Sequence, residues 1–469
     1  MPSPDLLGEQ RDCQTLRTIA ADVDRLAAAM HAARTRFGAR ARGFFLPDED
    51  DEVRRLLVTY RTYRAALLDI VAAHQGPAGA AATPAECRHF LLAFGAAVML
   101  YHWSDTLVST YRDVPVVREK LNEPEPRWGL PADTFDQLED GLTNPDNLQR
   151  LLAASAVFVR RRHEFARVAA ADADFGWLYD EARRQYRCVK RSWREIIPDR
   201  LDVELRGLAK RSLAPVQDLG LRLRAAALDL FGNIWLDERP NIPAAHRAQL
   251  RALLRPGDVL IVRPERKSST IFLPGWWTHG AFYYGGADAL AALGVTDAAP
   301  VKRALAQLAA SEAGGGAGGD DQAPCVLEAL AAGVVANPLA RTLGVDHVAA
   351  LRPRLAEDER CQAVADAFSH FGKPYDFEFN LTRSDRLVCT ELLYRSLHGK
   401  GPVRFAPVVR LGHPTLSADD IMGYVLDEYD GARPFELLAL SLRDMASGRS
   451  DFLAGAPALA AVQRTLGRA

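Results

Sequence analysis

The chain has 469 residues, of which 48% are hydrophobic and 25% are charged, and its formal net charge is -2. This balance is typical of a folded globular protein and gives no support to a polybasic nucleic-acid-binding protein, so we expect no nucleic-acid partner. The length exceeds that of one ordinary domain, and two or three domains are expected.

The sequence shows no targeting signal. No basic segment leads into an apolar run after Met1, and no stretch of 18 apolar residues occurs. We therefore expect neither a signal peptide nor a transmembrane helix, and only a peripheral membrane contact stays open. The cysteines are widely spaced and include no Cys-x-x-Cys pair, which favours reduced thiols in a cytoplasmic protein. They are Cys13, Cys87, Cys188, Cys325, Cys361 and Cys389.

The N-terminal half, residues 1–245, has apolar residues at helical spacing. Alternation of β-branched residues is nearly absent, so we predict an all-α domain that serves as a scaffold or as a cap. Helices are expected at 13–37, 51–74, 84–111, 146–170, 175–197 and 203–235.

Two polar features of this half invite functional hypotheses. His102 and Asp105 could bind a metal from one helix face, but without a second pair a histidine satisfied at a helix interface is the better interpretation. The arginines of 160–162 and 183–194 could face a phosphate or an anionic lipid. Because Glu164, Glu181 and other acids lie among them, a solvated, salt-bridged face is preferred.

The pattern changes near residue 250, where short β-branched runs bounded by glycine and proline predict strands. A helix is expected at 298–311, within an insertion at 287–324, and the glycine-rich tract 314–321 that follows the helix is predicted to be a flexible loop. The last segment, 431–469, is predicted to be a helical tail packed on the catalytic domain. The expected strands are 259–262, 276–284, 325–330, 333–335 and 347–352.

Cys389 follows a polar, turn-like lead-in at 382–385 and precedes Leu392, Leu393 and Leu397, which share one helix face. The thiol is therefore expected at a helix N-terminus, where unpaired backbone N–H groups favour the thiolate. The alternative is a buried structural cysteine.

Two strand residues complete a possible thiol hydrolase: His279 at the start of one strand and Glu328 inside another. The thiolate would attack a carbonyl carbon, the imidazole would move the proton, and the carboxylate would orient the imidazole. Glu328 lies in an apolar run, so its buried carboxylate requires a partner. His347 and His370 are the competing histidines.

Five motifs occur in an order that resembles the YiiX/YebB-like cysteine hydrolases, a circularly permuted branch of the NlpC-type papain-fold superfamily. They are Leu-Arg-Pro-Gly-Asp-Val-Leu (254–260), Thr-His-Gly-Ala (278–281), Val-Leu-Glu-Ala (326–329), Gly-Lys-Pro-Tyr-Asp-Phe-Glu-Phe (372–379) and Leu-Val-Cys-Thr-Glu-Leu (387–392). In the unpermuted enzymes the cysteine helix precedes the strands, whereas here it follows them. The resemblance covers residues 250–425.

The resemblance implies an α+β protein in which a permuted papain-like domain at 246–430, with a small antiparallel sheet, follows the helical domain. It implies Cys389 as nucleophile, His279 as general base and acid, and Glu328 as the residue that orients His279. Tyr375 is expected to line the site and to help hold the oxyanion. Glu391 matches a motif position and is interpreted as structural.

Around its histidine the family commonly has Ser-His-Val-Gly, whereas this chain has Thr-His-Gly-Ala. Trp277 and Phe377 lie near the motifs, and we predict that they line a substrate-binding surface that is apolar or aromatic; packing in the core is the alternative.

The resulting hypothesis is a cysteine hydrolase that cleaves a peptide, lipid or small-molecule amide through a thioester, with no metal or organic cofactor. An acyltransferase would use the same thioester, and a catalytically idle binding module would not use the thiol at all.

Overall fold

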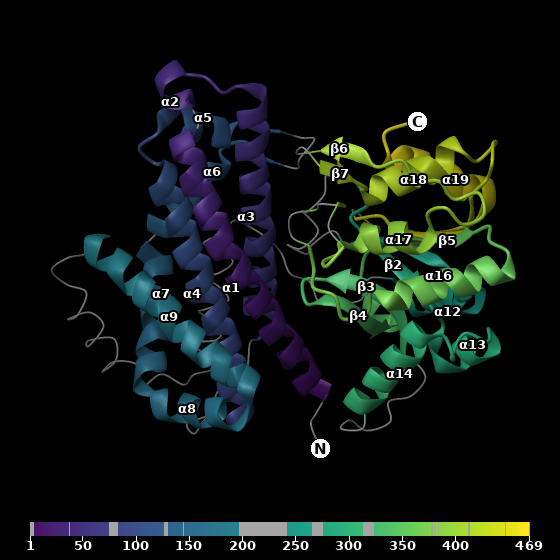
Figure 1. Cartoon of the computed structure of the whole chain (residues 1–469), viewed down its shortest axis with the longest axis horizontal. Helices are drawn as coiled ribbons and strands as arrows, with labels where there is room; N and C mark the ends of the chain where they lie inside the picture. The colour runs from purple at the N-terminus through teal and green to yellow at the C-terminus, as the bar shows by residue number, and fades with distance from the viewer. Residues whose placement is uncertain are drawn as a thin grey trace. The chain divides into compact units, whose positions relative to one another are not determined.

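The computed structural model describes residues 4–36, 38–74, 83–125, 130–143, 145–196, 242–264, 275–312, 323–376, 379, 381–382, 384–410, 413–445 and 447–468 (Figure 1). The chain divides into two compact units, an N-terminal one over Pro4–Leu236 and a C-terminal one over Asp237–Arg266 and Thr270–Ala469. The protein is α+β, and each unit is described by itself.

The N-terminal unit is helical, and its described residues contain no strand. The helices are α1 (Pro4–Arg36), α2 (Ala39–Arg42), α3 (Pro47–Ala73), α4 (Pro84–Tyr111), α5 (Pro115–Asn122), α6 (Thr134–Thr143), α7 (Pro145–Arg160), α8 (Arg162–Ala171) and α9 (Ala173–Ile196). The helix expected at 146–170 is two helices that meet at Arg161, and the helix expected at 203–235 lies outside the described residues.

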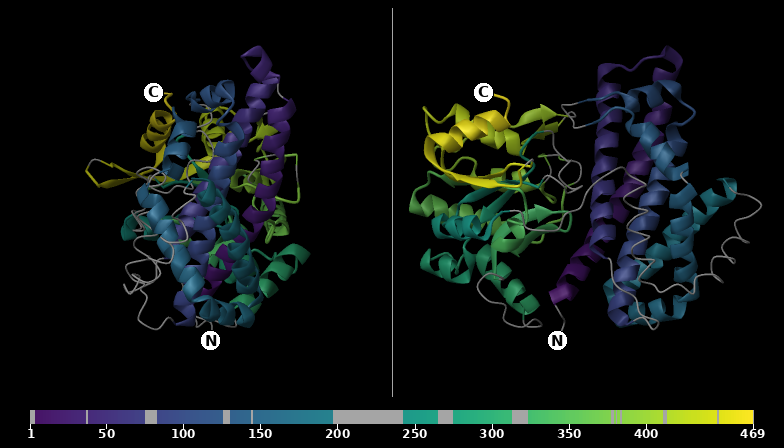
Figure 2. Two further views of the ribbon diagram at one scale, coloured as in Figure 1. Left: turned by 90° about the vertical axis from the view of Figure 1, so that its left-hand side faces the viewer. Right: turned by 180° about the vertical axis from the view of Figure 1, so that it is seen from behind.

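Helix α4 is the centre of this unit and contacts α1, α3 and α9 (Figures 1 and 2). It begins with Pro84 after Thr83, whose hydroxyl accepts from the Glu86 N–H at 3.2 Å, a capping box. Gly95 lets Leu178 of α9 approach, since a Cβ there would lie 2.8 Å from the leucine side chain. In length and composition α4 could cross a membrane, but most of it is buried inside the unit, as in a core helix.

His102, Arg161 and Arg184 have polar partners within this unit. His102 Nδ1 lies 2.6 Å from Gln185 Oε1, between α4 and α9, in agreement with the interface interpretation. Arg161 pairs with Glu164 and Arg184 with Glu181, both at 2.7 Å. Among the described residues no group of three potential metal ligands occurs.

The C-terminal unit is built on one antiparallel sheet in the order β4-β3-β2-β1-β5-β8-β9. Its strands are β1 (Val259–Arg263), β2 (His279–Tyr283), β3 (Pro324–Leu330), β4 (Gly333–Pro338), β5 (His347–Pro353), β8 (Phe435–Arg443) and β9 (Ser450–Leu453), and β6 (Val408–Arg410) pairs separately with β7 (His413–Thr415). Its helices are α12 (Ala244–Leu253), α13 (Gly286–Ala292), α14 (Ala299–Glu312), α15 (Leu339–Thr342), α16 (Glu357–Ser369), α17 (Cys389–Leu397), α18 (Ala418–Asp427) and α19 (Gly455–Thr465).

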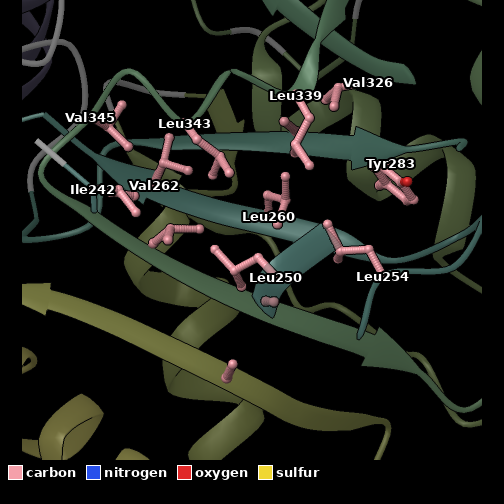
Figure 3. Packing of buried hydrophobic residues seen from close by; sticks show 14 of the residues in the cluster. Ile242, Leu250, Leu254, Leu260, Val262, Tyr283, Val326, Leu339, Leu343 and Val345 are labelled. Atoms are coloured by element: carbon pink, nitrogen blue, oxygen red, sulfur yellow. The ribbon is translucent and has the colours of Figure 1, made fainter. Parts of the chain in front are cut away.

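One apolar cluster covers a face of the sheet. Leu260 and Val262 alternate on β1, and Leu250 of α12 and Leu339 at the start of α15 pack toward them (Figure 3). Alternation along the strands directs these side chains to one side. Burial of this face fixes the register of the central strands, and with it the position of His279.

The C-terminal tail corrects the prediction for 431–469. Among the described residues of this segment only those of α19 form a helix, whereas β8 and β9 extend the sheet beyond β5 (Figure 2). The segment Phe435–Arg443 is rich in Leu and Ala, which suit a helix, but Phe435, Leu437 and Ala439 alternate into the interior and pair with β5.

The described part of the insertion after β2 contains two helices. The expected helix at 298–311 is present as α14, and α13 precedes it. The glycine tract at 314–319 lies outside the described residues.

Candidate active site

Cys389 is the first residue of α17 and is 3% exposed. The preceding residue, Val388, is extended (φ -90°, ψ 166°), so the chain turns into the helix at the cysteine itself. The thiol therefore lies among the unpaired N–H groups of the helix N-terminus. Backbone N–H groups of Thr390 and of Gly280 donate to it.

Strand β2 lies directly against α17, and Gly280 makes the close approach possible. A Cβ at Gly280 would lie 2.7 Å from Leu393 Cδ1 of α17. The glycine that replaces valine in the motif around the histidine thus brings the cysteine helix close to the strand that begins with His279.

His279 and Glu328 face one another on neighbouring strands. Ala281 is paired with Glu328 across β2 and β3, and His279 points to the same face because it is two residues from Ala281. The imidazole Nε2 lies 2.8 Å from Glu328 Oε2. Since Nε2 is engaged by the carboxylate, Nδ1 is the nitrogen left for the hydrogen bond between His279 and Cys389.

The other carboxylate oxygen of Glu328 is also satisfied. Oε1 accepts from Asn337 Nδ2 at 2.7 Å and from Thr342 Oγ1 at 3.0 Å. All three side chains are buried, Asn337 on β4 and Thr342 at the end of α15. The carboxylate is thus fixed in position before it orients the histidine.

The charges of the site favour an ion pair. Burial alone would raise the pKa of the Cys389 thiol, but the His279 charge, its hydrogen bond and the two backbone N–H groups lower the pKa overall. Burial alone would lower the pKa of His279, but Cys389 and Glu328 raise it to about 10. Burial likewise opposes ionisation of Glu328, yet hydrogen bonds from His279, Asn337 and Thr342 lower its pKa. A thiolate beside an imidazolium follows.

Tyr375 lies on the segment that flanks the start of α17. It forms a parallel bridge with Leu387, and Asp376 N–H donates to the Leu387 carbonyl at 3.1 Å. Burial and the negative charges of Cys389 and Asp376 raise the pKa of the Tyr375 phenol, so its O–H stays a donor near the thiol.

Of the two aromatic residues predicted to line the substrate site, the structure describes only Trp277. Trp277 is completely buried and its indole N–H donates to Thr465 Oγ1 of α19 at 3.1 Å, so it packs in the interior, contrary to the prediction. Sequence pattern could not reveal this, because the partner is distant in the chain. Phe377 lies outside the described residues.

The competing histidines lie in other environments. His347 Nδ1 accepts from the Arg443 N–H at 3.2 Å and its ring packs on Trp276. His370 Nδ1 lies 3.0 Å from Lys373 Nζ, and burial followed by that ammonium lowers its pKa to about 4. Of the three histidines, His279 is the one whose pKa reflects a hydrogen bond with Cys389.

Residues 253–458 match a protein-family model described as permuted papain-like amidase enzymes, YaeF/YiiX, of the C92 family. This matches the resemblance inferred from the motifs, and the C-terminal unit is a papain-like domain with a permuted order of its parts. The match covers less than half of the chain and supports a cysteine amidase or peptidase in general terms. No curated protein and no solved structure matches the sequence significantly.

Proposed function

We propose that the permuted papain-like domain is a cysteine amidase in which Cys389 is the nucleophile, His279 the general base and acid, and Glu328 the residue that orients His279. The observation that supports this assignment is the continuous hydrogen-bonded series from Glu328 through His279 to a helix-terminal thiol. Such a series is the arrangement that activates a thiol for acyl transfer.

In the first half-reaction the Cys389 thiolate attacks the amide carbonyl carbon and forms a tetrahedral intermediate. Its oxyanion would be held by the Cys389 backbone N–H, with Tyr375 as a second donor. The imidazolium of His279 gives its proton to the nitrogen as the C–N bond breaks, which releases the amine and leaves a thioester.

In the second half-reaction neutral His279 removes a proton from water, and the resulting hydroxide equivalent attacks the thioester. The thiolate leaves, the carboxylic acid is released, and the imidazolium returns. Glu328 stabilises each imidazolium state without itself being protonated. The scheme requires no metal or organic cofactor.

The substrate class that we propose is a peptide, lipid or small-molecule amide. The His279 side chain is 18% exposed while Cys389 is almost fully buried, so a reacting carbonyl would enter beside the imidazole.

The test is turnover of a panel of fluorogenic amides and thioesters by the wild type, Cys389→Ala and the control Cys361→Ala. Cys361 lies on α16 and is a partly buried thiol that donates to the Leu293 carbonyl. We expect turnover to be abolished in Cys389→Ala and unchanged in Cys361→Ala. Full turnover by Cys389→Ala would refute the assignment. Transfer product in place of free acid, with an added amine or alcohol, would identify an acyltransferase.

A further inference from the structure

The segment directly before His279 is held from outside the sheet. His279 is the first residue of β2, and its neighbour Thr278 makes a long hydrogen bond to the Val262 carbonyl at 3.3 Å. The pairing of β2 with β1 therefore restrains His279 on its C-terminal side. On its N-terminal side, residues 275–278 must restrain it.

Asp419, in the first turn of α18, provides this restraint. Its Oδ2 accepts from the Trp276 N–H at 2.8 Å, and its Oδ1 accepts from the Trp277 N–H at 2.6 Å. One carboxylate thus satisfies two consecutive amides of the segment. The N-terminus of α18 stabilises the negative charge that makes both hydrogen bonds strong.

Gly275 is the residue that allows the carboxylate to come so close. Its φ is +142°, and a Cβ there would lie 2.5 Å from both Cγ and Oδ2 of Asp419. Any side chain at this position would displace the carboxylate or the segment.

Two further contacts keep the segment in place. The Arg263 guanidinium donates to the Trp276 carbonyl and lies over the Trp276 ring, 4.9 Å from its centroid. The Trp277 indole is anchored to Thr465. The tryptophans before the histidine therefore act as anchors, and Asp419 supplies the anchor that binds the backbone itself.

We propose that Asp419 is a positioning residue for His279: by holding the Trp276 and Trp277 amides it sets where β2 begins and keeps the imidazole between Glu328 and Cys389. This role rests on the proposed function and adds to it a residue outside the three that carry out the chemistry. Asp419 comes 30 positions after the nucleophile, in a helix that does not contribute a reacting group.

The experiment compares Asp419→Asn with the matched control Asp420→Asn. Both carboxylates lie in the first turn of α18, but Asp420 caps that helix through the Ser417 N–H at 2.7 Å and pairs with Arg410. In Asp419→Asn the amide can accept one of the two N–H groups while its NH₂ opposes the other. Gly275→Ala is a second variant that disturbs the same contact from the opposite side.

Three quantities are measured on the full chain: amide hydrogen exchange at residues 276 and 277, the pH midpoint of Cys389 alkylation, and kcat. In Asp419→Asn and Gly275→Ala we expect exchange about tenfold faster or more, and a midpoint raised so that alkylation near neutral pH falls roughly tenfold. On a substrate that the wild type turns over, kcat should fall roughly 10- to 100-fold with little change in KM. Asp420→Asn should resemble the wild type in all three quantities, even where it lowers the thermal midpoint.

Unchanged exchange in Asp419→Asn would show that the carboxylate does not hold the segment and would overturn the inference. Faster exchange with a wild-type alkylation midpoint would overturn it as well, since the anchor would not control His279. If the wild-type Cys389 itself labels like an ordinary thiol, the proposed ion pair fails and the inference fails with it. That outcome is visible in the wild type alone, so the two failures are distinguishable.

Discussion

His279 Nε2 lies 2.8 Å from Glu328 Oε2, while Asn337 and Thr342 bind the other oxygen of the same carboxylate. The glutamate therefore has one orientation in which all its partners are satisfied, and that orientation directs Nδ1 of the imidazole toward Cys389. The helix that carries the thiol, α17, follows strands β1 to β5 in sequence and packs against β2 and β3.

We predict that Glu328→Gln lowers kcat roughly 10²- to 10³-fold with a small change in KM. The amide preserves the shape of the side chain but removes the charge that stabilises the imidazolium, and it leaves the tautomer of the histidine undefined. Steady-state kinetics on an amide that the wild type cleaves, with a thermal unfolding curve to check folding, measures this. The exposed Glu436 on β8 offers the matched control Glu436→Gln, which should be as active as the wild type. Equal kcat values for Glu328→Gln and the wild type would contradict the role given to Glu328.

The ion pair predicts a bell-shaped dependence of kcat/KM on pH. At low pH the thiolate is protonated and activity falls; the pKa of Cys389 is lowered, so this limb lies below the usual thiol range. At high pH the imidazolium loses its proton near 10, and the proton needed by the leaving amine is absent. Alkylation of Cys389 requires only the thiolate, so it should fall on the acid limb and stay high on the alkaline limb.

His279→Ala should abolish the acid-shifted alkylation. Without the imidazolium the burial of Cys389 is no longer compensated, so we expect its pKa to rise above the usual thiol value and its labelling at pH 7 to fall at least tenfold. Site-resolved mass spectrometry of iodoacetamide adducts, with Cys361 as an internal reference in the same sample, gives the ratio. An unchanged ratio of Cys389 to Cys361 labelling would mean that His279 does not activate the thiol.

Much of the fold was predictable because its signals are local. The strands β1 to β5 are short runs bounded by glycine and proline, and each was expected close to its observed range. Strand β8 was not, because Leu and Ala dominate Phe435–Arg443 and only its pairing with β5, more than 80 residues earlier, decides its conformation. The sequence pattern of Phe435–Arg443 is compatible with both a helix and a strand.

The residues of the candidate site also differ in whether local sequence signals predict them or tertiary contacts alone decide them. Motifs and the presence of a carboxylate in an apolar strand predict Cys389, His279 and Glu328. Asn337 also follows an apolar run, Val334–Ala336, so a signal for it existed. Thr342 and Asp419 gave none, because a polar residue near a helix end is common and its partner is set by tertiary contacts alone.

Gly280→Ala should destabilise the C-terminal unit and reduce the reactivity of Cys389. The new methyl group would lie 2.7 Å from Leu393 Cδ1 and 3.6 Å from Ile261 Cδ1, so the Leu393 side chain or α17 itself must shift away from β2. Overpacking of this kind costs about 1–3 kcal/mol. The check is a double-mutant cycle with Leu393→Ala, in which urea unfolding gives the free energy of unfolding of each variant. The labelling of Cys389 is measured on the same variants. Because the leucine is what the methyl meets, the cost of Gly280→Ala should shrink in the Leu393→Ala background; equal costs in both backgrounds would place the clash elsewhere.

Glu391 predicts a pH-dependent stability that is separate from catalysis. Its carboxyl group is fully buried in the first turn of α17; Arg395 Nε donates to Oε1 at 2.7 Å, and Oε2 has no hydrogen-bond partner within the described part of the chain. Burial raises the pKa of Glu391 to about 7, opposed by the hydrogen bond and charge of Arg395 and assisted by the charge of Asp376.

The unfolded chain ionises this group near its ordinary value of 4.5, whereas the folded chain keeps it protonated up to about 7. Between these values the folded state binds more protons than the unfolded state, so stability falls as pH rises through this window. The loss amounts to about 3 kcal/mol by pH 8. Glu391→Gln cannot ionise, so its unfolding free energy should fall less than that of the wild type between pH 5 and pH 8, by about 2.5 kcal/mol.

Urea unfolding at the two pH values, followed by pulsed hydrogen exchange of peptides from α17, measures the difference within the C-terminal unit. Glu436→Gln on the exposed side of β8 serves as the control and should reproduce the wild-type pH dependence. If Glu391→Gln and the wild type lose the same free energy between pH 5 and pH 8, the carboxyl group is already ionised at pH 5. Arg395 would then compensate the burial of Glu391 completely, and Glu391 would be a permanent anion in the first turn of α17.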